Sequence, residues 1–161
     1  MGSNLPLTNN PEISEAELRS LHSKAYHWAL SLCQGESEDA KEVMQKVYLK
    51  VYEGRARYKA SPPASFKTWF FAVIKVTAKE HRRQVWKSWF REGPTIDLSP
   101  RAETSDTSTP ESQDQRERVI MALKSLPTRQ RETIELVTYH DLTVDEVALV
   151  LGISTGSART H

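Results

Sequence analysis

The sequence lacks the features that mark secreted and membrane proteins. Its single cysteine, Cys33, excludes an internal disulfide bond, and no apolar run approaches the length that a membrane-spanning helix needs. The N-terminus has no apolar core of the kind found in signal peptides. We therefore expect a cytoplasmic protein with no segment inserted in a membrane, in which Cys33 is a small buried side chain rather than a reactive thiol.

Motifs of enzyme active sites are missing as well. The five histidines show neither the HExxH spacing nor a pairing with cysteine at the spacing of a metal site. The sequence has no glycine-rich phosphate loop and no nucleophile motif. We expect no catalytic residue, no metal site and no cofactor, and we expect that the chain is not an enzyme. His27 and His140 are expected to be structural or to face solvent.

Most of the sequence has the apolar spacing of amphipathic helices, and no stretch alternates between apolar and polar residues for long enough to predict a strand. Apolar residues recur three and four positions apart through most of the chain. Two capping boxes, Ser14 with Glu17 and Thr143 with Glu146, predict the starts of helices. The predicted fold class is all-α, with two small helical domains joined by a flexible acidic linker.

Composition divides the chain into four parts. Residues 92–114 are rich in serine, threonine, proline and acidic residues, and cannot bury enough apolar surface to order themselves. The predicted parts are a disordered leader (1–12), a first helical domain (13–91), the linker (92–114) and a second helical domain (115–161).

The net charge of +1 conceals a strong asymmetry. Residues 50–91 hold eleven basic and two acidic side chains, a net charge of +9. Residues 92–117 hold two basic and seven acidic side chains, a net charge of −5. The basic block predicts a polyanion as partner, and the acidic block predicts a basic surface.

The final stretch, LGISTGSARTH, predicts a helix-turn-helix. Gly152 suits the left-handed residue that follows a helix, and Ser154 is a good N-cap for the next helix. Ala158 would face inward. The polar residues left on the outer face, where they can meet phosphates and base edges in a major groove, are Thr155, Ser157 and Arg159. A generic helical hairpin is the alternative.

The order of these parts resembles a bacterial sigma factor of the small extracytoplasmic-function class. The segments DAKEVMQKVYLKVY and ASFKTWFFAVIKVTAKEHRRQ are similar to region 2 of that family, and LPTRQRETIELVTYHDLTVDEVALVLGISTGSAR is similar to region 4. The resemblance implies a subunit that binds core RNA polymerase, directs it to −10 and −35 promoter elements and aids DNA opening. It also implies control by an anti-sigma factor anchored in the membrane.

The resemblance further implies roles for individual residues. The family docks on the β′ clamp helices and the β flap of the polymerase, and the matching polymerase-binding residues are Asp39, Glu42, Gln45, Lys46 and Leu49. The −10 element is implied to meet Arg55, Arg57, Tyr58, Lys59, Ser65, Lys67, Lys75, Lys79, Arg82 and Arg83. The −35 element is implied to meet Ser154, Thr155, Ser157 and Arg159. Among the −10 residues, cations would contact phosphates and Tyr58 would offer a stacking face in a loop shaped by Pro62 and Pro63.

Two alternatives stay open. The helix that begins after Ser154 has room for about two turns, whereas the family's helix continues for two or three more. We expect the chain to be a shortened form of a working sigma factor. A sigma mimic that sequesters an anti-sigma factor is the alternative, and a plain helix-turn-helix regulator would leave the first domain unexplained.

Overall fold

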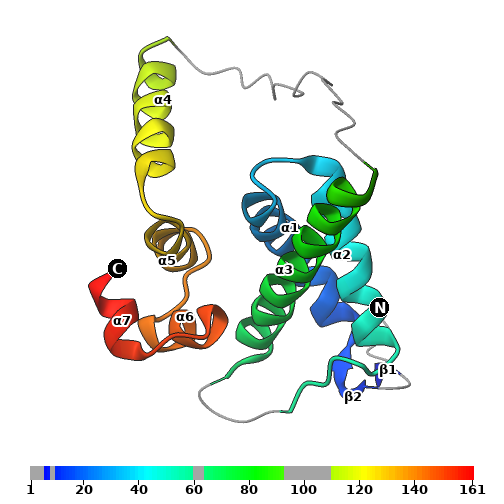
Figure 1. Cartoon of the computed structure of the whole chain (residues 1–161). Coiled ribbons are helices and arrows are strands. Elements are labelled where there is room, and N and C mark those ends of the chain that lie inside the picture. Colours follow the sequence, from blue (N-terminus) through cyan, green and yellow to red (C-terminus); the bar gives the residue numbers. More distant parts are fainter. Residues whose placement is uncertain (1–5, 8–9, 60–63, 93–109) are drawn as a thin grey trace.

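A computed structural model describes residues 6–7, 10–59, 64–92 and 110–161, and its described part is almost entirely helical. Two short antiparallel strands, β1 (Pro6–Leu7) and β2 (Asn10–Ser14), precede the helices. The helices are α1 (Glu15–Leu32), α2 (Ser37–Tyr52), α3 (Phe66–Glu92), α4 (Pro110–Ser125), α5 (Thr128–Thr138), α6 (Val144–Leu151) and α7 (Thr155–Thr160). The predicted all-α class with two helical domains is confirmed (Figure 1).

The predicted boundaries need two corrections. Part of the leader forms the strand pair, because Ile13 in β2 is fully buried in the core and holds this segment against the first domain. The last residues of the predicted linker already belong to α4, which starts at Pro110, a residue whose fixed φ suits the first turn of a helix. The remaining leader residues, 1–5 and 8–9, and linker residues 93–109 lie outside the described residues.

The first domain consists of α1, α2 and α3 around an aromatic and aliphatic core. Trp28 is fully buried, donates from its indole nitrogen to the carbonyl oxygen of Phe71 at 3.2 Å, and stacks on the Phe71 ring. The predicted capping box of Ser14 and Glu17 is confirmed at the start of α1. Burial of these large side chains supplies most of the favourable free energy of this domain.

The second domain contains the predicted helix-turn-helix. Its first helix, α6, begins with the expected capping box of Thr143 and Glu146 and ends at Gly152, whose φ of 64° is left-handed as predicted. Ser154 caps α7 through its side chain, and Ala158 is buried against the preceding helices. The helix α4 projects away from the rest of the molecule (Figure 1).

The two domains pack against each other. The helix α3 contacts α6 about as extensively as it contacts α1 and α2, and α7 lies on the side of α6 that faces away from α3 (Figure 1). Leu136, Val147 and Val150 of the second domain belong to the same hydrophobic cluster as the core of the first. We call this packing of α5 and α6 on α3 the closed arrangement. Among the described helices, none is both long enough and apolar enough to cross a membrane.

Candidate nucleic-acid interface

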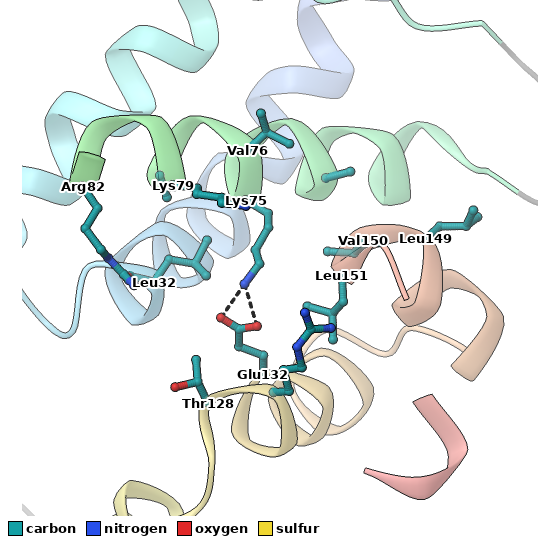
Figure 2. Close-up of a pocket in the computed structure, with 14 residues that line it drawn as sticks. Leu32, Lys75, Val76, Lys79, Arg82, Thr128, Glu132, Leu149, Val150 and Leu151 are labelled. Atoms are coloured by element: carbon teal, nitrogen blue, oxygen red, sulfur yellow. Dashed lines mark hydrogen bonds and ion pairs between the residues drawn. The ribbon is translucent and has the colours of Figure 1, made fainter. Parts of the chain in front are cut away.

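The basic residues of α3 line a cleft between the domains. The cleft has a volume of about 480 Å³, and α3 contributes Lys75, Lys79 and Arg82 to its wall. The opposite wall comes from α5 and α6, with Glu132 and Leu149 among its residues (Figure 2). Three members of the predicted basic stripe therefore line the cleft on the side of the second domain. The fourth member of the stripe, Arg83, is exposed to solvent and is not part of the cleft wall.

Side chains of this stripe are already engaged within the protein. Lys75 donates to both carboxylate oxygens of Glu132, each at 2.6 Å (Figure 2). Arg82 donates to the carbonyl oxygen of Leu32 at 2.7 Å. A charge-assisted pair between largely buried groups is among the stronger polar contacts in a protein. Lys75 thus faces an acid of the second domain, whereas Lys79 and Arg82 remain exposed to solvent.

The start of α3 contacts the second domain as well. Lys67 donates to the carbonyl oxygen of His140. Burial lowers the pKa of the Lys67 ammonium, and the nearby Lys24 lowers it further, while Asp141 and Glu146 act in the opposite direction. Burial of a charged group is costly, and the hydrogen bond from Lys67 to the His140 carbonyl of the second domain offsets part of this cost.

Glu146 joins the helix-turn-helix to the first domain. One carboxylate oxygen accepts from the Thr68 hydroxyl at 3.1 Å and from Ser65 at 3.5 Å, and the other closes the capping box with Thr143. Burial raises the pKa of this carboxyl, but hydrogen bonds from Thr143, Thr68 and Ser65 outweigh it, so the pKa lies below its usual value. The glutamate of the α6 capping box therefore also fixes α6 on α3.

His140 inserts from the second domain into the aromatic core of the first. Its side chain is fully buried, and its ring meets Phe71 edge-on at 4.7 Å and Trp28 at 6.1 Å between ring centroids. Neither imidazole nitrogen has a hydrogen-bond partner among the described residues, and the closest carboxylate oxygen, of Glu135, is 3.6 Å away. The expectation that His140 is structural agrees with this position.

Several of the loop residues predicted to contact the −10 element already contact other residues of the protein. Arg55 pairs with Glu53 at 2.5 Å, and Arg57 donates to the carbonyl oxygen of Gly54. The half-buried ring of Tyr58 contacts Phe66 and Trp69, each at 5.5 Å between centroids, so only part of it can serve a base. Lys59 is exposed. Pro62 and Pro63 lie outside the described residues.

The predicted polymerase-binding residues lie on one side of α2. Gln45 and Leu49 are exposed, while the buried side of the same helix is built from Val43, Val47 and other core residues. Tyr52 is also exposed, one turn beyond Leu49. Sequence reasoning missed Tyr52, although its spacing of three from Leu49 was the signal that could have placed it on this face.

The charged members of that face form a network with α3. His81 is buried and contacts Asp39 at 3.1 Å, and Lys46 lies 2.9 Å from Glu42 and 3.1 Å from Nδ1 of His81. The hydrogen bond from Lys46 lowers the pKa of Glu42, which burial raises in part. Asp39, Glu42 and His81 are close enough to share a cation, and the Lys46 ammonium provides a positive charge beside them. Sequence reasoning did not find His81, because no spacing relates it to α2.

The predicted −35 residues lie on or beside α7. Ser157 and Arg159 are exposed, Thr155 is half-buried, and the hydroxyl of Ser154 accepts from the backbone N–H of Ser157 at 3.1 Å. Thus one of the four, Ser154, is used to cap the helix. The roles of all these residues in binding remain predictions.

Comparisons with known proteins match both domains. The family described as Sigma-70 region 2 matches residues 15–88, and Sigma-70, region 4 matches residues 116–161. The chain is 28% identical over 123 residues to the RNA polymerase sigma factor CarQ of Myxococcus xanthus, covering 74% of this chain and 66% of that protein. It is 24% identical over 128 residues to the RNA polymerase sigma factor HrpL of Pseudomonas syringae pv. syringae, covering 78% and 68%. The chain thus spans about two thirds of the length of these relatives.

A solved structure shares the fold across both domains. It is the co-crystal structure of the sigma factor RpoE in complex with the anti-sigma factor NepR from Bartonella quintana. The TM-score is 0.68 at 18% identity, and the match covers 91% of this chain and 87% of the other. At 18% identity, the match shows that the two proteins share a fold.

Proposed function

We propose that this chain, which belongs to the extracytoplasmic-function class of the sigma-70 family, is a promoter-specificity subunit of bacterial RNA polymerase. It would act in the cytoplasm, bring the core enzyme to −10 and −35 elements and aid DNA opening, while the polymerase does the chemistry. The observation that carries this proposal is the presence, on one chain, of a basic helix (α3) and a helix-turn-helix whose outer helix is accessible.

Polymerase binding is proposed for the exposed face of α2. Leu49 and Tyr52 are exposed apolar side chains beside the acids Asp39 and Glu42. Exposed apolar anchors on the same helix face as charged side chains suit a protein partner with a partly apolar, partly charged surface, and the β′ clamp helices are the partner that the family implies. Region 4 would reach the β flap.

Promoter reading is proposed to require separation of the domains. The predicted −10 residues Ser65, Lys67 and Lys75 all contact the second domain in the closed arrangement. A phosphate cannot meet Lys75 while Glu132 holds it. By contrast, Ser157 and Arg159 are exposed, so −35 DNA can be met without any rearrangement. We infer that opening frees the −10 face.

An anti-sigma factor is the proposed regulatory partner. The solved structure with the same fold is a sigma factor in complex with an anti-sigma factor. In this chain, such a partner would favour the closed arrangement by bridging both domains, and it is proposed to be anchored in the membrane. Stabilising one of two arrangements requires only that the partner bind it more tightly than the other.

Two charge variants test the proposal. Asp39→Lys with Glu42→Lys should abolish pull-down of core polymerase while circular dichroism stays helical, whereas Glu38→Lys on the same helix should not. Arg82→Ala with Arg83→Ala should keep polymerase binding but weaken promoter binding, with a smaller dependence on salt because about two phosphate contacts are lost. Failure to bind polymerase, together with binding of an anti-sigma factor, would support the sigma-mimic alternative instead.

A further inference from the structure

The helix α4 has exposed apolar side chains that the described part of the chain leaves uncovered. The exposed fractions of Val119, Ile120 and Met121 are 54%, 49% and 67%. Leu123, about one turn after Ile120, is half-buried. Among the described residues, the hydrophobic core cluster includes none from α4, and this helix projects away from the rest of the molecule (Figure 1). Neighbouring exposed apolar side chains of this kind are typical of a surface that binds another protein.

Two opposite charges flank these apolar residues on one side of α4. Glu117 precedes Ile120 by three positions, and Lys124 directly follows Leu123. Because Glu117 and Lys124 are seven residues apart, almost two full turns, they lie in the same row along the helix. Both are exposed, and neither forms an ion pair with another described residue. We call Glu117, Ile120, Leu123 and Lys124 the α4 stripe.

We infer that the α4 stripe binds the same stripe of a second copy of this chain, with the two helices antiparallel. A two-fold rotation about the middle of the stripe reverses its order, so Glu117 of each copy meets Lys124 of the other. Ile120 of each copy then packs against Leu123 of the other, as core positions do in an antiparallel pair of helices. One alignment of the two helices therefore satisfies the apolar and the charged contacts together.

The order of the charges favours a second copy over an unrelated protein surface. A partner surface with charges of one sign would attract one end of the α4 stripe and repel the other. The stripe itself has the complementary order, because its N-terminal end is acidic and its C-terminal end is basic. The contact is small, since only α4 contributes to it, and small interfaces belong to weak, transient complexes. We therefore expect a reversible dimer that forms only at high concentration.

Sedimentation equilibrium of the full chain tests the inference. The wild type should show dimers at concentrations on the order of 0.1 mM, as expected for a small interface. Glu117→Lys should weaken association about tenfold, because a lysine then meets Lys124 of the other copy, and Lys124→Glu should do the same with two glutamates. An equal mixture of these two variants should associate about as strongly as the wild type, because both contacts again join a lysine to a glutamate. The matched control is Arg118→Glu, which reverses a charge on the opposite side of α4 and should have no effect.

Several results would overturn the inference. One is a wild type that sediments as a monomer at this concentration, and another is association that Glu117→Lys leaves unchanged. A third is a mixture of the two charge variants that stays as monomeric as either variant alone. Ile120→Ser with Leu123→Ser should also abolish association while circular dichroism shows the same helix content, and dimers that persist would place the contact on another surface. These measurements involve neither polymerase nor DNA, so their failure would leave the proposed function intact.

Discussion

Lys75 on α3 and Glu132 on α5 lie 57 residues apart in sequence and form two hydrogen bonds of 2.6 Å each. The lysine side chain is 26% exposed and the glutamate side chain only 10%. This pair links a predicted −10 contact to the second domain. Near it, the ring of His140 fills the space beside Phe71, so polar and apolar contacts support the closed arrangement together.

Glu132→Gln should open the closed arrangement. The amide keeps the shape of the carboxylate but leaves the Lys75 ammonium without its counter-charge, which should weaken the domain contact by about 1–3 kcal/mol. We expect a larger radius of gyration in small-angle X-ray scattering and tighter binding of −10 duplex DNA. Glu80→Gln is the control, because Glu80 pairs with Lys50 inside the first domain. An unchanged radius of gyration in Glu132→Gln would contradict this role of the pair.

The contact of Glu146 with Thr68 and Ser65 should depend on pH. The pKa of Glu146 is lower in the folded protein than its usual value of 4.5. When the pKa of a carboxyl is lower in the folded state than in the unfolded state, the carboxyl stabilises the folded state. Its contribution is complete at pH values above the unfolded-state pKa and is lost as the pH falls through the folded-state pKa. Below about pH 4.5, the free energy of unfolding should therefore fall more steeply in the wild type than in Glu146→Gln. Parallel pH profiles for the two proteins would show that the contact contributes nothing.

Local features of the fold were predictable from the sequence, whereas contacts between the domains were not. The capping boxes, the left-handed Gly152 and the buried Ala158 depend on residues within a few positions of one another, so short-range rules apply. The strand that contains Ile13 was missed, because the burial of one apolar residue outweighed the polar composition around it.

Only the α3 wall of the interdomain cleft was predictable from the sequence. Spacing placed Lys75, Lys79, Arg82 and Arg83 on one face of a helix, and the first three of them line the cleft. It gave no sign of Glu132 or His140 opposite, because their position depends on how two domains meet across a linker. Helical spacing says which residues share a face but not what that face contacts.

Cys33 should react slowly in the folded protein. Burial raises the pKa of its thiol to about 11, Asp39 contributes in the same direction, and Arg82 opposes both. At pH 8 the thiolate should then be about a hundredfold rarer than for an ordinary thiol, an effect that the greater nucleophilicity of a more basic thiolate offsets only in part. We expect modification by a disulfide reagent to be about tenfold slower, or more, than in urea. Asp39→Asn should raise the rate in the folded protein, and equal rates for both proteins would exclude the contribution of Asp39.

Two glycines of the helix-turn-helix should respond in opposite ways to alanine. Gly152 has a φ of 64°, and a Cβ there would meet nothing within 4 Å. The only cost of an alanine at this position is therefore that of holding an L-residue in the left-handed backbone conformation. Gly152→Ala should lower the free energy of unfolding by about 1 kcal/mol. Gly156 lies within α7, where a Cβ would come only to 3.9 Å from the Ser154 hydroxyl. Gly156→Ala should therefore stabilise the domain by up to about 1 kcal/mol, because alanine favours the helix. Urea unfolding of both variants checks the pair, and a loss of stability in Gly156→Ala would mean that α7 has less room beside Ser154 than the structure indicates.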